Sequence, residues 1–316
     1  MATTLPAPVR TGGIDRKLTY FAWLTLGWNV LVVIFGAVVR STGSGAGCGN
    51  HWPLCNGEVI PVSPGLHTVI EFTHRMMTGV SGWLVLGLLL AVLRWKPRPD
   101  PARKAAVATM GFLILEALLG AVLVKLGYVT GNRSTGRVVA LAIHLTNTLT
   151  LVAFLTLTAW LVSGRPKPRL ALGAWLTLVV TALMGVSGSL AALGDTLFPA
   201  TSLRAAFAQD FTAGAPMLLR LRTVHPVSVV LATGALLWAV TRVNRSKRLA
   251  SWTLALFASQ IVAGIVDLVL LAPWWMQVVH LLGADLYWVS LLLLLFSTDA
   301  VPEANWAPQM KTPATS

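Results

Sequence analysis

Four histidines lie inside long apolar segments of the chain: His74, His144, His225 and His280. They fall on the even-numbered members of eight such segments, each about one and a half to two turns from the start. If the segments cross a membrane in order, the even ones run in the same direction, so the four imidazoles lie at one depth. Ionisable side chains are costly in hydrocarbon and usually functional. The pattern predicts two pairs of axial ligands for two haems.

Eight apolar runs must position these side chains. Of 316 residues, 55% are hydrophobic and 11% are charged, whereas a soluble domain has about 25% charged residues. Each run is near the ~20 residues that a helix needs to cross a bilayer. In lipid a single apolar run can satisfy its backbone hydrogen bonds only as a helix. We predict an all-α integral membrane protein with eight transmembrane helices. They cover residues 18–39, 66–93, 105–124, 138–162, 170–193, 223–240, 249–271 and 273–296.

The net charge of +13 is distributed between the segments and not gathered on one domain. Lys and Arg concentrate in the N-terminal tail and in the second, fourth and sixth connections, and the odd-numbered connections carry fewer. By the positive-inside rule we expect a multi-pass protein of the cell membrane with both termini in the cytoplasm. This distribution argues against nucleic-acid binding. The first apolar run is too long for a cleavable signal, so we expect it to stay as the first helix.

The two halves of the chain follow one plan. The segment-end sequence from Gly36 to Gly45 has a counterpart from Gly185 to Gly194, and Glu116 of the third segment has Gln260 of the seventh. We therefore expect two tandem four-helix bundles related by pseudo-two-fold symmetry. The expected divisions are a cytoplasmic tail (1–17), an N-terminal bundle (18–163) with an outer loop (40–65), a cytoplasmic linker (164–169), a C-terminal bundle (170–297) with an outer loop (194–222) and a cytoplasmic tail (298–316).

We pair His74 with His144 and His225 with His280, because the two histidines of each pair are expected at the same depth in the membrane. A low-spin haem takes two nitrogen ligands from opposite sides of its ring, which facing helices can supply. The histidines would then be the haem iron ligands. The alternative is four unrelated histidines that form hydrogen bonds between helices.

The residue three positions before the first histidine of each pair differs between the halves. It is Glu71 in the first half and Arg222 in the second. A carboxylate beside a haem edge can act as a base or stabilise positive charge, whereas a guanidinium suits a propionate. The first half thus resembles a reaction site and the second a cofactor site. Alternatively, Glu71 forms an ion pair with Arg75, and Arg222 marks the membrane interface.

The remaining polar residues leave several alternatives open. Cys48 and Cys55 lie in the first outer loop, where they could form a structural disulfide, a redox-active dithiol or free thiols. Glu116 lies in mid-membrane, and we favour hydrogen bonding between helices by a protonated acid over a role in a proton path. Asp267 and Asp285 are interpreted in the same way.

Three stretches carry a family resemblance: Gly36 through Gly45, Trp52-Pro-Leu-Cys-Asn-Gly57, and Glu71-Phe-Thr-His-Arg75. They resemble the N-terminal half of haem A synthase, in its bacterial subset with a cysteine pair in the first outer loop. The histidines of the later segments match as well, so the resemblance covers about residues 18–296. It implies an oxidoreductase that converts the C8 methyl group of haem O to the formyl group of haem A for terminal oxidases. Two hydroxylations would give a geminal diol that loses water.

The resemblance also implies residue roles and partners. His74 and His144 would hold the substrate haem O, and His225 and His280 a cofactor haem b that assists electron transfer. Glu71 would be the catalytic carboxylate, with Arg75 and Arg222 as possible propionate contacts and a Cys48–Cys55 disulfide. A haem O synthase (a farnesyltransferase) and an unidentified electron acceptor are the possible protein partners. The main alternative is a dihaem b-type electron-transfer protein without haem-modifying activity. A transporter of parallel repeats is a further alternative, and it predicts broken helices at corresponding positions.

Overall fold

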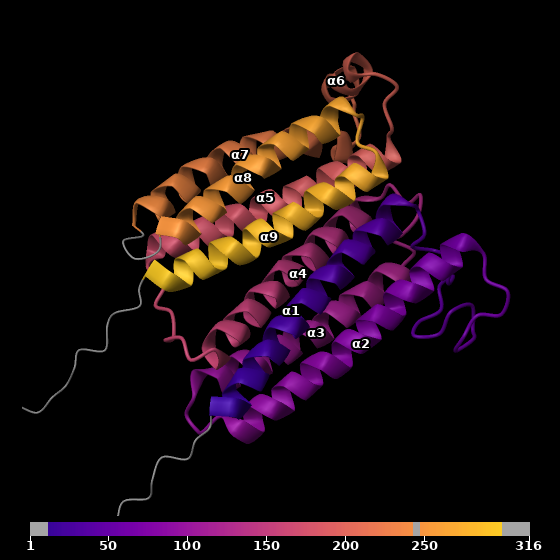
Figure 1. Ribbon diagram of the computed structural model, residues 1–316. Coiled ribbons are helices and arrows are strands. Elements are labelled where there is room, and N and C mark those ends of the chain that lie inside the picture. The colour runs from indigo at the N-terminus through magenta and orange to yellow at the C-terminus, as the bar shows by residue number, and fades with distance from the viewer. Residues whose placement is uncertain (1–11, 243–246, 299–316) are drawn as a thin grey trace, which may run out of the picture.

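The computed structural model describes residues 12–242 and 247–298, which form nine α-helices and no strand (Figure 1). This confirms the all-α prediction. The helices are α1 (Gly12–Ser41), α2 (Leu66–Trp95), α3 (Pro101–Lys125), α4 (Thr135–Val162), α5 (Leu172–Leu197), α6 (Leu203–Phe211), α7 (Met217–Thr241), α8 (Lys247–Val269) and α9 (Trp274–Thr298).

Within the described part of the chain, eight helices are long and apolar enough to cross a membrane, all of them except α6. The expected eight spans are therefore present, and the chain is a multi-pass membrane protein. The helices extend beyond the apolar runs, because hydropathy marks only the part that fits hydrocarbon. Thus α1 begins at Gly12 and not at 18, and α7 begins at Met217 and not at 223. Residues 1–11 and 299–316 of the expected tails lie outside the described residues.

The nine-residue helix α6 was not expected from the sequence. It lies in the second outer connection, where Ser202 caps its first turn by accepting a hydrogen bond from the backbone N–H of Ala205. Because α5 continues to Leu197 and α7 starts at Met217, the connection between them is shorter than the expected loop at 194–222.

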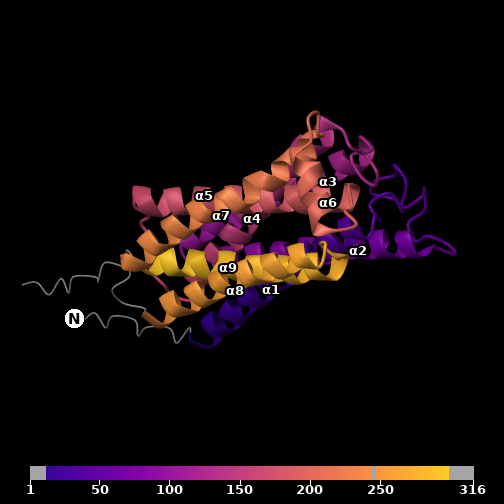
Figure 2. The same ribbon diagram turned by 90° about the horizontal axis from the view of Figure 1, so that it is seen from above.

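The long helices form two groups of four that lie side by side (Figures 1 and 2). Helices α1 to α4 pack together, as do α5, α7, α8 and α9, and the two bundles meet through α1, α4, α5 and α9. The loop between α1 and α2 and the helix α6 lie at the same end of the molecule (Figure 1). The pseudo-two-fold relation between the bundles stays a prediction.

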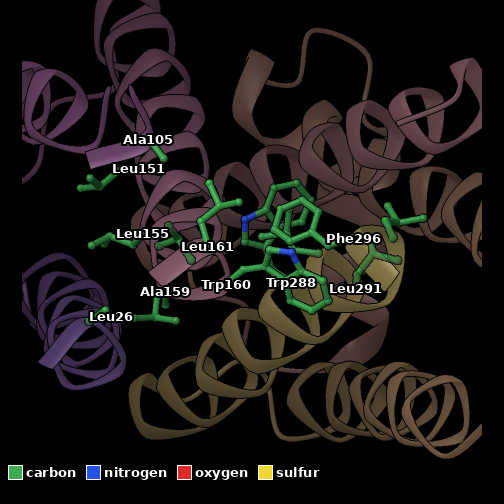
Figure 3. Close-up of a cluster of buried hydrophobic side chains, with 14 of the residues drawn as sticks. Leu26, Ala105, Leu151, Leu155, Ala159, Trp160, Leu161, Trp288, Leu291 and Phe296 are labelled. Atoms are coloured by element: carbon green, nitrogen blue, oxygen red, sulfur yellow. The ribbon is translucent and has the colours of Figure 1, made fainter. Parts of the chain in front are cut away.

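Aromatic side chains join the bundles where α4 meets α9 (Figure 3). The Trp160 ring lies edge-on to that of Phe296, with centroids 5.8 Å apart. The indole N–H of Trp288 donates to the backbone oxygen of Leu149 at 3.0 Å. These contacts hold together the two helices that carry His144 and His280.

Candidate active site

The first histidine pair is carried by α2 and α4 within the N-terminal bundle. His144 lies close enough to His74 to act on it electrostatically. The His74 ring packs against Gly36 of α1, where an added Cβ would lie 3.2 Å from Cε1. The ring of Phe35 is nearly parallel to that of His74, with centroids 6.4 Å apart. Helix α1 therefore gives the imidazole a close-fitting apolar support.

The second pair is carried by α7 and α9, and His225 likewise acts electrostatically on His280. Both rings again lie against glycines. A Cβ at Gly188 of α5 would lie 2.8 Å from Cε1 of His225, and one at Gly264 of α8 would lie 3.4 Å from Cε1 of His280. The structure thus brings together the members of each predicted pair.

These surroundings fit haem ligation. The Nδ1 atoms of His74, His144 and His280 are buried and have no hydrogen-bond partner within residues 12–242 and 247–298, and Nδ1 of His225 lies 3.3 Å from the hydroxyl of Ser187. A haem iron needs two imidazoles from facing helices in apolar surroundings, which is the donor set that each bundle offers. Among the described residues, no group of three or more His, Cys, Asp or Glu side chains could hold another metal ion.

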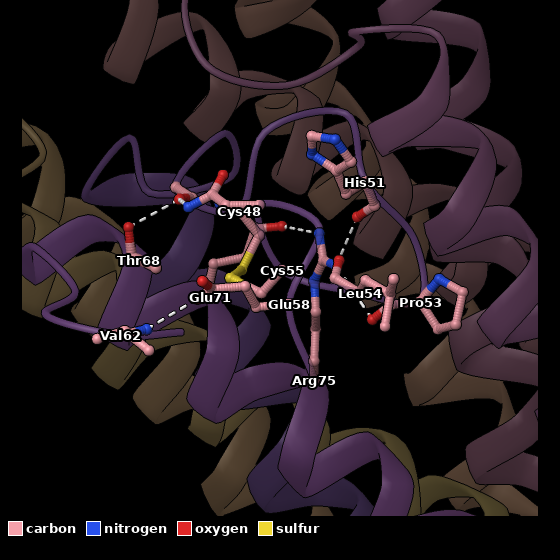
Figure 4. The surroundings of a disulfide bond; sticks show 12 residues. Cys48, His51, Pro53, Leu54, Cys55, Glu58, Val62, Thr68, Glu71 and Arg75 are labelled. Carbon is pink, nitrogen blue, oxygen red and sulfur yellow. Dashed lines mark hydrogen bonds and ion pairs between the residues drawn. A yellow bond between two sulfur atoms is a disulfide. The ribbon is translucent and has the colours of Figure 1, made fainter. Parts of the chain in front are cut away.

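Glu71 lies one turn before His74 on α2, and only 3% of it is exposed. It lies beside the loop that carries Cys48 (Figure 4). Its Oε2 accepts a hydrogen bond from the backbone N–H of Cys48 at 2.8 Å. Its Oε1 forms an ion pair with the Arg75 guanidinium. The ion pair that the sequence left as an alternative is therefore present, and it fixes the carboxylate in place. A catalytic role for Glu71 stays a prediction.

The outer loop above Glu71 is closed by a disulfide between Cys48 and Cys55 (Figure 4). Arg75 also ties the loop to α2, because its Nη1 donates to the backbone oxygens of His51 at 2.7 Å and Leu54 at 2.6 Å. The predicted disulfide is thus present, held between two side chains of α2. A redox role for this bridge stays a prediction.

Arg222 makes its contacts with protein groups beside the second pair. Its Nε lies 3.0 Å from a carboxylate oxygen of Asp195 on α5, and its Nη1 lies 3.4 Å from one of Asp210 on α6. Its Nη2 donates to the backbone oxygen of Phe198 at 2.9 Å. Burial raises the pKa of the Asp210 carboxyl above its usual range, and the neighbouring Arg222 opposes that rise. Arg222 therefore fastens α6 to the bundle, and its predicted contact with a propionate stays a prediction, as does that of Arg75.

One polar contact between the bundles was missed by the sequence interpretation. Arg40, at the outer end of α1, donates to Oγ1 of Thr196 on α5 at 3.1 Å and to Oε1 of Gln277 on α9 at 2.9 Å. Gln277 lies one turn outward of His280. The only signal in the sequence was an arginine directly after an apolar run, which we interpreted as the end of a span.

The mid-membrane acids differ in their partners. Glu116 accepts hydrogen bonds from Asn147 at 2.7 Å and from Thr148, so the expected bonding between helices is confirmed. In contrast, one oxygen each of Asp267 and Asp285 is buried without a hydrogen-bond partner in the described ranges. A proton-path role for these groups is not tested by the structure.

Comparison with known proteins places this geometry in a family. The profile of the cytochrome oxidase assembly protein family matches residues 19–292. A protein of Thermus thermophilus named protoheme IX farnesyltransferase is 43% identical over 297 residues, which are 90% of this chain and 48% of that protein. This chain therefore spans about half the length of that relative.

Proteins named heme A synthase match over shorter stretches. The one from Shouchella clausii is 48% identical over 101 residues, covering 31% of this chain and 33% of that protein. The one from Exiguobacterium sibiricum is 38% identical over 109 residues, covering 34% of this chain and 36% of that protein. Because the family profile covers most of the chain, including all four intramembrane histidines, the chain belongs to the cytochrome oxidase assembly protein family.

Proposed function

We propose that the chain is a haem A synthase, which oxidises the C8 methyl group of haem O to a formyl group by two successive hydroxylations. Relatives of that name support the proposal. The structural observation that carries it is the placement of acids. Glu71 lies one turn outward of His74, and Glu116 lies beside His144. The second pair has Arg222 and Gln260 at the corresponding positions.

In this proposal His74 and His144 hold the substrate haem O, and His225 and His280 hold haem b as a resident cofactor. The haem b, when bound, supplies one-electron transfer. The protein contributes the close-fitting support of both sites, since glycines on α1, α5 and α8 admit three of the four rings.

Glu71 supplies fixed negative charge near the methyl group that reacts. In each hydroxylation a C–H bond of the methyl carbon is replaced by a C–O bond to the oxygen of a water molecule, two protons are released and two electrons pass to the acceptor. The carbon therefore gains positive character as the C–H bond breaks. A buried carboxylate stabilises such charge because it needs no reorganisation at the moment of reaction. The Cys48 N–H and the Arg75 guanidinium keep Glu71 in one position. Loss of an electrostatic group of this kind typically costs about 100- to 1,000-fold in rate.

The proposed substrate, haem O, carries a farnesyl group, so a farnesyltransferase must supply it. The Thermus thermophilus relative, named protoheme IX farnesyltransferase, contains a region similar to this chain within a chain about twice as long. We propose that this chain also receives haem O from a farnesyltransferase in the same membrane. Both termini would lie in the cytoplasm, with the haem sites near the outer leaflet, and an acceptor of unknown identity would remove the electrons.

The test is expression of the full chain in a host that makes haem O and lacks haem A. Extracted haems are separated by chromatography and identified by mass. Haem A should form with the wild-type chain and be absent with His74→Ala or His144→Ala. If the wild-type protein binds haem b in both sites and forms no haem A, the dihaem electron-transfer alternative holds in place of this proposal.

A further inference from the structure

We propose that Glu116 of α3 is a positioning residue for His144. Its Oε2 accepts the Nδ1–H of the imidazole, which fixes the ring and leaves Nε2 to bind iron. The inference rests on the proposed function, because it takes His144 to be an iron ligand. It adds a residue to which the family resemblance assigns no role.

Glu116 and His144 lie close to each other. Nδ1 of His144 lies 3.7 Å from Oε2 of Glu116. This Nδ1 is buried and lacks a hydrogen-bond partner in the described part of the chain. A hydrogen bond needs about 2.7–3.2 Å, so a small rotation of either side chain closes the gap. Metal-bound histidines almost always donate their second ring N–H to a carboxylate, a carbonyl or water.

The Glu116 carboxylate is held by side chains of α4. Asn147 donates from Nδ2 to Oε2 of Glu116 at 2.7 Å, and also to the backbone oxygen of Phe112 at 3.0 Å. The Thr148 hydroxyl contacts the other carboxylate oxygen and the backbone oxygen of His144, the latter at 2.9 Å. Asn147 and Thr148 lie one turn after His144 on α4. The carboxylate is therefore fixed against the same helix turn that carries the imidazole.

The second bundle has an amide, Gln260, at the position that corresponds to Glu116. Gln260 of α8 lies against Gly283, three residues after His280, just as Glu116 contacts Asn147, three residues after His144. Oε1 of Gln260 and Nδ1 of His280 are both buried without a partner within the described ranges. An acceptor thus stands at this position in both halves, although only one is an acid. We infer that accepting a hydrogen bond is the function of this position.

The test compares variants that keep or remove the acceptor. In a His280→Ala background, which restricts bis-histidine binding to the first pair, full-length protein is titrated with ferric haem b as the probe. Glu116→Gln keeps an acceptor and should retain the low-spin bis-imidazole spectrum and an affinity within about twofold of the unsubstituted protein. Glu116→Met and Glu116→Leu fill similar space without an acceptor, and should bind roughly 10- to 100-fold more weakly, with a high-spin component.

Two results would overturn the inference. In the first, Glu116→Met and Glu116→Leu bind haem with the same affinity as the unsubstituted protein. In the second, Glu116→Gln loses as much haem affinity as Glu116→Met and Glu116→Leu do. A folding defect is recognised with His280 intact, because haem binding at the second pair should be unchanged in every Glu116 variant. Gln260→Met is the matched control and should weaken only the second pair. If His144→Ala leaves haem binding in the His280→Ala background unaltered, the proposed function itself fails, which is a separate outcome.

Discussion

Replacing Gly188 by alanine should weaken haem b binding while leaving the helices intact. The added Cβ would lie 2.8 Å from Cε1 of His225 and 3.1 Å from its Nδ1, whereas ordinary contact begins at 3.4 Å. The imidazole ring of His225 must therefore move by about 0.6 Å. This displaces it from the position in which its Nδ1 contacts the hydroxyl of Ser187. Overpacking of this kind costs about 1–3 kcal/mol. At 1.4 kcal/mol per tenfold, haem b should bind roughly 5- to 150-fold more weakly.

The fold should survive this change, because alanine is favoured over glycine inside a helix by about 1 kcal/mol. The assay is titration of haem-free, full-length protein with haem b, followed by the low-spin spectrum. Gly264→Ala is the matched control, since its Cβ would lie 3.4 and 3.7 Å from Cε1 and Nε2 of His280, in ordinary contact. It should bind haem b within about twofold of the wild-type protein, because no atom needs to move.

The comparison of these two alanines decides whether the packing argument is right. Both substitutions affect a ligand of the same haem, and both gain the same helix propensity. If Gly188→Ala and Gly264→Ala bind haem b equally well, the close approach of Gly188 does not position His225. If Gly188→Ala instead weakens the haem of the first pair, the assignment of His225 to the second pair is wrong.

Three further outcomes are expected. Glu71→Ala should retain haem at both pairs and form haem A roughly 100-fold more slowly, measured by chromatography of extracted haems; full activity would remove the role of the carboxylate. Mass spectrometry without reductant should find Cys48 linked to Cys55, and two alkylatable thiols in fresh membranes would count against a stable bridge. Arg40→Met removes two hydrogen bonds between the bundles. Because a hydrogen bond from a charged donor contributes about 2 kcal/mol to the free energy of unfolding, the melting temperature of this variant in detergent should fall. Exposed Arg16, which donates a hydrogen bond to Tyr20 of its own helix, supplies the control Arg16→Met.

The sequence was sufficient to predict the spans, and its assignment of the histidines to two pairs stays a prediction. A run of about 20 apolar residues leaves the backbone one way to satisfy its hydrogen bonds in lipid. Equal depth then follows from counting residues along helices that cross in the same direction. The pairing of His74 with His144 was predicted in this way, because position along the chain sets the height of each side chain.

Contacts between distant segments could not be predicted in this way. Arg40 lies at the end of an apolar run, yet its partners Thr196 and Gln277 come from the other half of the chain. Helix α6 is nine residues long in a polar connection, and so short a segment gives no clear periodicity. In both cases the structure depends on packing between elements, which local hydrophobic patterns do not encode.

The difference in charge between the halves predicts an order of reduction potentials. Glu116 lies beside His144 with uncharged hydrogen-bond partners, whereas the uncharged Gln260 stands at the matching position of the second half. Glu71 and Arg222 contribute less to the difference, because each is held in ion pairs with groups of opposite charge. Charges act strongly in a buried, low-dielectric site. Negative charge stabilises ferric iron, so the haem beside Glu116 should have the lower potential and a haem at the second pair the higher one. Potentiometric titration of protein loaded with haem b at both pairs should show two waves, with His280→Ala removing the higher one. Loss of the lower wave in that variant would contradict the electrostatic argument while leaving the ligand assignments untouched.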